Sequence, residues 1–153
     1  MSARRTPVTG LPALVGEELG VSDWRDVSAA TVTAFAEITG DRQWIHVDAE
    51  RAAAGPFGAP VAHGFLLMSM VPAMLSEVVD VIGADHVVNK GVSDVRLLSP
   101  VRVGDRVRGR VRVARVRPRP RGFWETDYGV ELAAEGSGTP ALRMTLTLLY
   151  HVE

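Results

Sequence analysis

An aspartate and a histidine, Asp41 and His46, stand five residues apart in the first third of the chain. A second histidine, His63, follows seventeen residues after His46 and precedes a glycine and a long apolar run. A neutral imidazole can take a proton from water, and a nearby carboxylate can hold that water or move a second proton. The start of a helix adds unpaired N–H groups that stabilise a developing oxyanion. These residue types suggest the addition of water to an unsaturated acyl thioester, or its removal.

The same pair has a purely structural interpretation. Asp41 can cap a local turn, and His46 can be hydrogen-bonded at the surface of the domain. A metal site at Asp41, His46 and His63 is not predicted, because no two histidines stand four residues apart as in helical zinc motifs. The absence of cysteine excludes disulfides, thiolate metal sites and a Cys nucleophile. His86 and His151 have no partner that the sequence reveals, and we assign them no role.

A predicted helix leads into Asp41. Ser28 is a good N-cap and Gly40 is a typical helix end, so Asp41 would follow directly on a rigid element. The apolar face of this helix is expected to comprise Val32, Phe35, Ala36 and Ile38.

A second helix is predicted to begin at Gly64. Its sequence is apolar nearly all round, which is typical of a helix buried on most sides. Pro72 should kink it, because proline lacks the N–H and clashes with the preceding turn. We expect this helix to be the central element of the core.

The second half of the chain has the period of β-strands, which are predicted over residues 85–90, 92–98, 105–117, 122–133 and 142–152. In the third of these, arginines alternate with valines, and a β-bulge at Val113-Ala114 would keep Arg115 and Arg117 on the arginine face. Residues 117–122 would close a hairpin. Segregated helices and strands predict an α+β fold, with an antiparallel sheet curled around the apolar helix.

The composition is that of one globular domain of 153 residues, with 46% hydrophobic and 23% charged residues and a net charge of −1. Residues 1–20 are expected to form an irregular arm of this single domain, residues 1–153. The first residues lack the apolar run of a secretory signal, and the apolar stretch 64–83 is too short and too polar to span a membrane. We therefore expect a cytoplasmic protein.

Three stretches of the sequence resemble the MaoC-like, (R)-specific enoyl-CoA hydratases. Residues 35–46 resemble the family signature of an aromatic residue followed by S/T-G-D-x-N-P-hydrophobic-His, and Ala52 matches its later small residue. Residues 58–65 resemble the segment that leads into the central helix, and residues 89–105 resemble the following strand and turn. One departure is that Gln43 and Trp44 replace the usual Asn-Pro.

The resemblance implies a hot-dog fold, in which a curved antiparallel sheet wraps one long helix, and it implies a homodimer or a higher homo-oligomer. It implies that Asp41 and His46 activate the water, that Ser69 orients the aspartate and that the Gly64 N–H holds the thioester carbonyl. Gln43 would retain a hydrogen-bonding amide. Syn addition of water would give an (R)-3-hydroxyacyl thioester, and the reverse reaction would be a dehydration. No cofactor is expected, since coenzyme A would be part of the substrate.

Several further residues are expected to contact the acyl-CoA or acyl-carrier-protein substrate. His63 could donate to the thioester or simply satisfy local backbone groups, whereas Trp44 and Phe57 would shape the acyl pocket. Ten of the seventeen Lys and Arg residues fall between positions 96 and 121. Arg96, Arg108 and Arg110 would contact phosphates or an acidic carrier surface, unless this stripe is only a solvated outer face. The net charge of −1 and the lack of an RNA-binding motif argue against nucleic acid.

Two other functions are compatible with a hot-dog fold. The chain could be a non-catalytic thioester-binding or scaffold subunit, although Asp41, His46 and Ser69 are all present. A thioesterase would place its carboxylate on the central helix, where Glu77 is the acid well inside the helix but lies late in it.

Overall fold

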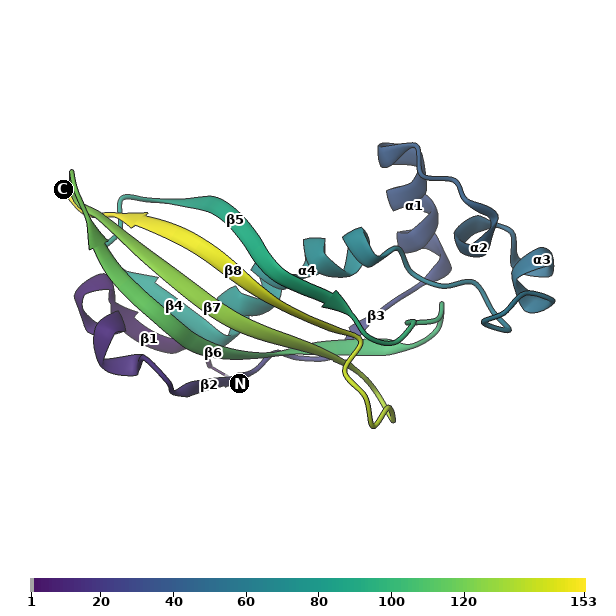
Figure 1. Ribbon diagram of the computed structural model, residues 1–153, viewed down its shortest axis with the longest axis horizontal. Helices are drawn as coiled ribbons and strands as arrows, with labels where there is room; N and C mark the ends of the chain where they lie inside the picture. Colours follow the sequence, from purple (N-terminus) through teal and green to yellow (C-terminus); the bar gives the residue numbers. More distant parts are fainter. Residues whose placement is uncertain (1) are drawn as a thin grey trace.

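The computed structural model describes residues 2–153 and has the predicted α+β architecture (Figure 1). Its helices are the 3-10 helix η1 (Val8–Leu14) and the α-helices α1 (Ala29–Thr39), α2 (Trp44–Val47), α3 (Ala49–Ala53) and α4 (Gly64–Val78). Its strands are β1 (Arg4–Pro7), β2 (Glu18–Val21), β3 (Arg25–Asp26), β4 (Val79–Ile82), β5 (His86–Leu97), β6 (Arg106–Arg119), β7 (Phe123–Ala134) and β8 (Leu142–His151).

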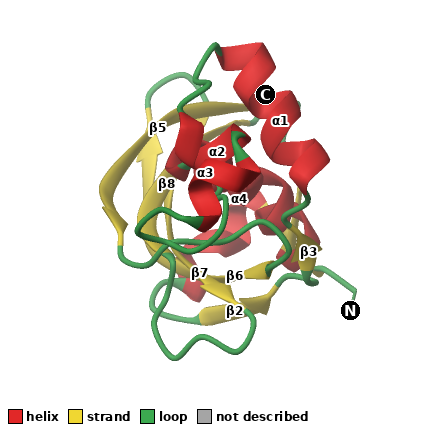
Figure 2. Ribbon diagram, turned by 90° about the vertical axis from the view of Figure 1, so that its right-hand side faces the viewer, coloured by secondary structure: helices red, strands yellow, loops and turns green. Residues whose placement is uncertain are grey.

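The main sheet is antiparallel and has the strand order β2-β6-β7-β8-β5, with β3 also paired to β6. Strand β5 therefore lies at an edge. The sheet curves along the length of the molecule, and α1, α2 and α3 gather beyond one of its ends (Figure 1). Figure 2 looks onto that end, with α4 behind the three shorter helices.

Helix α4 lies against the inner face of the sheet and is the predicted core element. Its buried residues are Leu66, Leu67, Val71, Met74, Leu75 and Val78. Gly109 of β6 lets the two layers approach closely, because a Cβ there would lie 3.2 Å from the sulfur of Met74. The helix continues through Pro72 to Val78. No helix within residues 2–153 is long and apolar enough to cross a membrane.

The predicted alternation in β6 is confirmed. Val107, Val111 and Val113 are buried on the inner face and Val116 is partly buried, while the arginines lie on the outer face. The register with β7 shifts between Val113 and Arg115, which is the predicted β-bulge. Residues 85–90 and 92–98 were expected to be two strands, but they form the single strand β5, whose register with β8 shifts at two places. The β6–β7 turn is also shorter than predicted, because β6 runs to Arg119.

The predicted start and end of α1 are confirmed, but the predicted apolar face is wrong at one residue. The Ser28 hydroxyl accepts a hydrogen bond from the Thr31 N–H at 3.1 Å, and Gly40 ends the helix with a φ of 79°. Ile38, however, is 85% exposed. Successive helical residues are separated by about 100°, so Ile38 lies about 200° from the buried Ala36.

The N-terminal segment is not the irregular arm that we expected. Strand β1 pairs in parallel with β4, and η1 follows it directly. Val8, Leu11 and Leu14 of η1 are buried in the main hydrophobic core. The prolines and glycines that suggested an irregular arm instead accommodate a 3-10 helix, which covers part of the core.

Candidate active site

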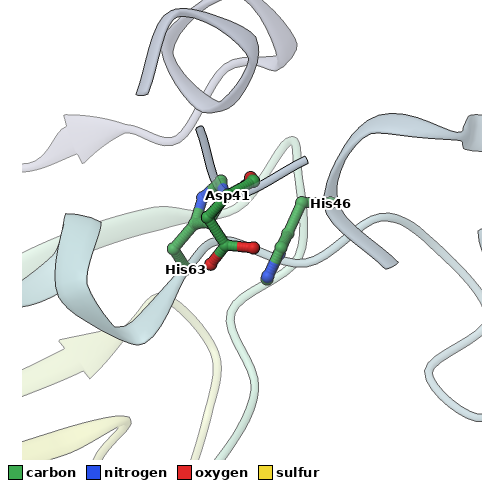
Figure 3. A group of neighbouring side chains, drawn as sticks. All are labelled: Asp41, His46 and His63. Carbon is green, nitrogen blue, oxygen red and sulfur yellow. The ribbon is translucent and has the colours of Figure 1, made fainter. Parts of the chain in front are cut away.

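The structure brings together Asp41, His46 and His63, which come from three different segments of the chain. Asp41 follows α1, His46 lies in α2, and His63 directly precedes α4. One ligand atom from each of the three side chains lies within 4.8 Å of the others. Figure 3 shows the Asp41 carboxylate beside both imidazoles. The predicted acid and base therefore lie together in a compact cluster, with His63 as its third side chain.

The surroundings of His46 determine which of its nitrogens can act as a base. Helix α2 begins just after the Asp41 loop and buries this imidazole, which is 9% exposed. Its Nδ1 lies 2.6 Å from the backbone oxygen of Val61. A carbonyl oxygen only accepts hydrogen bonds, so Nδ1 carries the hydrogen. The neutral imidazole therefore keeps a free lone pair on Nε2.

His63 holds the other two residues in place. Its ring is 2% exposed and stacks on that of His46, with a centroid distance of 3.7 Å. The ring of Phe35 also packs against His63, with a centroid distance of 4.9 Å and an interplanar angle of 55°. The His63 Nε2 lies 2.9 Å from the backbone oxygen of Asp41 and must donate the hydrogen bond to it. The Nδ1 of His63 is then a buried acceptor that has no hydrogen-bond partner among the described residues. His63 thus joins the Asp41 loop to the start of α4.

A pocket of about 230 Å³ lies at the N-terminus of α4. Its lining is mostly apolar and consists of Phe57, Ala62, Gly64, Leu67, Leu97, Leu98, Ser99, Pro100 and Val101. Within residues 2–153 no side chain caps α4, so the N–H groups of its first turn remain available for a ligand. Sequence reasoning placed Phe57 and Gly64 here. The absence of a Cβ at Gly64 also makes room for Leu97, whose side chain a methyl group would overlap.

Ser69 does not have the expected contact with Asp41. Its hydroxyl donates to the backbone oxygen of Phe65, one turn earlier in α4, at 2.7 Å. The side chain is exposed, and its hydrogen bond is entirely within the helix. The backbone oxygen of Asp41 is instead held by His63, which agrees with the alternative in which His63 satisfies backbone groups.

The unusual Gln43-Trp44 pair is compatible with the short helix α2. Gln43 is the exposed N-cap residue, and its side chain makes no capping hydrogen bond. Trp44 is the first helical residue, a position that proline favours but does not require. The Arg51 guanidinium lies 4.4 Å from the centre of the Trp44 ring, and Gly55 packs on the same ring. Trp44 therefore supports the 44–55 segment and does not line the pocket as expected.

The structure does not bring Arg96, Arg108 or Arg110 to the cluster. The Arg108 guanidinium covers the ring of Trp24, and Arg110 forms an ion pair with Glu18 at 2.8 Å. Arg96 lines a separate pocket on the outer face, together with Arg110. Acidic residues of β7 pair with other members of the stripe, such as Asp127 with Arg115. These arginines lie on the outer face of the sheet, and their contact with phosphates or an acidic carrier surface stays a prediction.

Comparison with known proteins agrees with this geometry. The family model described as MaoC like domain matches residues 11–132. The 3-hydroxyacyl-thioester dehydratase Z of Mycobacterium tuberculosis is 41% identical over 134 residues, which cover 88% of this chain and 89% of that protein. Nodulation protein N of Rhizobium leguminosarum bv. viciae is 40% identical and covers 86% and 83%, respectively. The (R)-hydratase from A. caviae superposes with a TM-score of 0.72, at 25% identity, over 91% of this chain and 96% of that one.

These similarities confirm three predictions: the family, the hot-dog fold and the hydratase or dehydratase class of enzyme. By sequence and by structure, the chain belongs to the MaoC-like domain family.

Proposed function

We propose that this protein interconverts (R)-3-hydroxyacyl thioesters and 2-enoyl thioesters by dehydration and hydration. The observation that carries the proposal is the cluster of Asp41 and His46 near the uncapped start of α4, in which the Val61 carbonyl occupies the Nδ1 of His46 and leaves the lone pair on Nε2. Relatives named as a 3-hydroxyacyl-thioester dehydratase and a 3-hydroxybutyryl-CoA dehydratase support the substrate class. The likeness to an (R)-hydratase supports the stereochemistry.

The proposed hydration uses one water molecule bound between Asp41 and His46. The Asp41 carboxylate accepts a hydrogen bond from the water and orients it, and the His46 Nε2 removes a proton as the water oxygen bonds to the β-carbon. The N–H groups at the start of α4 stabilise the charge that develops on the thioester oxygen. The protonated His46 then returns the proton to the α-carbon. Both additions occur on the same face of the substrate, and dehydration follows the reverse path.

The proposed substrate is an acyl thioester of coenzyme A or of an acyl carrier protein. The apolar pocket would hold the first carbons of the acyl chain, with Phe57 and Leu97 in its wall. His63 acts by positioning Asp41 and His46, because its Nε2 is already bound to the Asp41 backbone.

A homodimer is the proposed assembly. Strand β5 is an edge strand whose exposed apolar residues are Val87, Val88, Val92, Val95 and Leu97. An edge of this kind exposes unpaired backbone groups together with apolar surface, and pairing with the same edge of a second copy would satisfy both. Leu97 also lines the pocket beside Gly64, so the partner would shield that side of the site.

The test is the loss of ultraviolet absorbance of the enoyl thioester when 2-enoyl-CoA substrates of increasing chain length are mixed with the protein. Asp41→Asn and His46→Gln should each lower kcat on the order of a hundredfold or more, because each removes one of the groups that bind or activate the water. Chiral chromatography of the product should give the (R)-3-hydroxyacyl thioester.

The matched control is Glu50→Gln, which removes a carboxylate of the neighbouring helix α3 and should leave kcat unchanged. Folding of each variant is checked by circular dichroism. A wild-type protein that hydrates neither CoA-bound nor carrier-bound enoyl substrates would contradict the proposal and favour a scaffold subunit. Formation of the (S) product would contradict the proposed stereochemistry alone.

A further inference from the structure

Three side chains at the other end of the sheet form a second cluster of nitrogen and oxygen donors. His86 is the first residue of β5, His151 is the last residue of β8, and the two are directly opposite in the β5–β8 ladder. Asp85 immediately precedes His86. β5 begins and β8 ends near the C-terminus, far from α1, α2 and α3 (Figure 1). This cluster is therefore separate from Asp41 and His46.

The donors of the second cluster converge. The two carboxylate oxygens of Asp85 lie 2.8 and 3.0 Å from the Nδ1 of His151, and one of them lies 3.4 Å from the Nδ1 of His86. The imidazoles are stacked, with their centroids 4.8 Å apart and an interplanar angle of 21°. One ligand atom from each residue lies within 4.8 Å of the others. Both imidazoles thus turn their Nδ1 toward the same carboxylate.

The backbone and one aromatic ring fix this arrangement. The Asp85 N–H donates to the backbone oxygen of His151 at 3.0 Å, and the His86 N–H donates to the Asp85 carboxylate at 3.1 Å. Phe123 lies edge-on to both imidazoles, with centroid distances of 5.9 Å to His86 and 4.7 Å to His151. Little side-chain freedom would be lost if a ligand bound here, because the three side chains are already held together.

We propose that Asp85, His86 and His151 bind a divalent first-row transition-metal ion, for which Zn²⁺ is the natural probe. Two imidazoles and one carboxylate form a common protein ligand set for Zn²⁺. Each neutral imidazole keeps its hydrogen on Nε2 and binds the ion through Nδ1. Tetrahedral coordination with bonds of about 2.0–2.2 Å places the donors about 3.3–3.6 Å apart.

The existing geometry needs only a small adjustment to reach this arrangement. The Oδ2 of Asp85 lies 3.0 Å from the Nδ1 of His151 and 3.4 Å from the Nδ1 of His86, and both separations are close to the required value. The two imidazole nitrogens must approach each other, which rotation of the half-exposed His86 allows. The fourth coordination position faces solvent, because the side chains of His86 and Asp85 are 50% and 40% exposed.

The bound ion would clamp the edge of the sheet. Tyr150 is buried on the inner face, so its neighbour His151 and the opposing His86 point to the outer face of the sheet. The proposed pairing of two subunits along the β5 edge would leave this outer face accessible to the ion. The ion would link the loop before β5 to the end of β8. Its expected effect is on stability and not on the reaction, and the inference does not depend on the proposed activity.

The experiment titrates the metal-free protein with Zn²⁺ and follows heat release together with the imidazole NMR signals. The chain has four histidines, so every signal can be assigned by substitution. We expect one equivalent of Zn²⁺ to shift the signals of His86 and His151. His86→Gln and His151→Gln should each weaken the affinity by at least about tenfold. Zn²⁺ should raise the melting temperature of the wild type but not that of His151→Gln.

The matched control is Asp94→Asn, which removes another carboxylate from β5 and should bind Zn²⁺ like the wild type. Circular dichroism and the metal-free melting temperature show whether each variant is folded. If His151→Gln does not fold, His86→Gln still tests the site, because His86 is half-exposed and its substitution should be tolerated. The proposal is overturned if Zn²⁺ does not bind saturably. It is equally overturned if only His46 and His63 respond, or if the affinity survives both histidine substitutions.

Discussion

At the scale of single residues, the hydrogen bonds of His46 and His63 show that these two stacked imidazoles have different roles. The Val61 carbonyl fixes the hydrogen of His46 on Nδ1 and leaves Nε2 as a base. The Asp41 carbonyl fixes the hydrogen of His63 on Nε2, which makes His63 a support. The sequence predicted Asp41 and His46 from their types and their order. It offered His63 as a residue that satisfies backbone groups but could not identify Asp41 as the partner, because His63 comes 22 residues after Asp41 and the contact uses a backbone atom.

His63→Leu should therefore lower kcat about tenfold to a hundredfold while leaving a folded protein. The substitution keeps a side chain that can contact Phe35 and His46 but removes the donor to the Asp41 backbone. Loss of that hydrogen bond is expected to reduce the free energy of unfolding by about 1–3 kcal/mol. Enoyl-CoA kinetics and urea unfolding measure the two effects.

His63→Gln is the informative comparison, because its side-chain amide can restore a donor. Partial recovery of kcat in His63→Gln supports the positioning role. If both variants had wild-type kcat, the hydrogen bond to Asp41 would have no part in catalysis.

At the scale of elements, the outer face of the sheet is a salt-bridged surface. Glu125 of β7 is 1% exposed and is covered by Lys90, Arg117 and Arg119. The hydrogen bonds of these cations, that of Lys90 foremost, lower the pKa of the Glu125 carboxyl to about 2, although burial opposes the shift. The alternating pattern of β6 predicted its arginine face, but the sequence could not show which acids lie opposite. That pairing depends on the β6–β7 register and on the bulge.

Glu125→Gln should destabilise the protein at neutral pH, by about 1–2 kcal/mol, since it removes the charge shared by three cations. The folded-state pKa is below the ordinary value of 4.5, so the ionised group stabilises the fold above pH 4.5 and loses this effect as the pH falls toward 2. The difference in unfolding free energy between wild type and variant should shrink over the same range.

Urea unfolding at several pH values measures this difference. Glu131→Gln is the matched control on the same strand and face, because Glu131 is 36% exposed and pairs with Arg143 alone. Its effect should be small at every pH, as for other exposed ion pairs. If the difference in unfolding free energy between wild type and Glu125→Gln stays constant from neutral pH to pH 2, the loss of stability comes from packing and not from the charge.

At the scale of the whole molecule, the central helix and the meander of strands after it were predictable, whereas the N-terminal elements and the contacts across the sheet were not. The apolar run from Gly64 and the alternation in β6 each dictate a local structure, and an antiparallel sheet around one helix follows from them. The His86–His151 pair depends instead on the register between β5 and β8, which two irregularities shift. The exposed edge of β5 likewise follows only from the strand order.

Val92→Lys should convert the proposed dimer to a monomer. Val92 lies in the middle of the β5 edge and is 53% exposed, and lysine on an edge strand opposes pairing with a second sheet. Light scattering after gel filtration gives the mass. The matched control is Ile38→Lys, which places the same charge at an 85% exposed apolar residue of α1 and should leave the dimer intact. Because Leu97 of β5 borders the pocket, the Val92→Lys monomer should also have a raised KM. A Val92→Lys protein that keeps the dimer mass would place the subunit interface elsewhere.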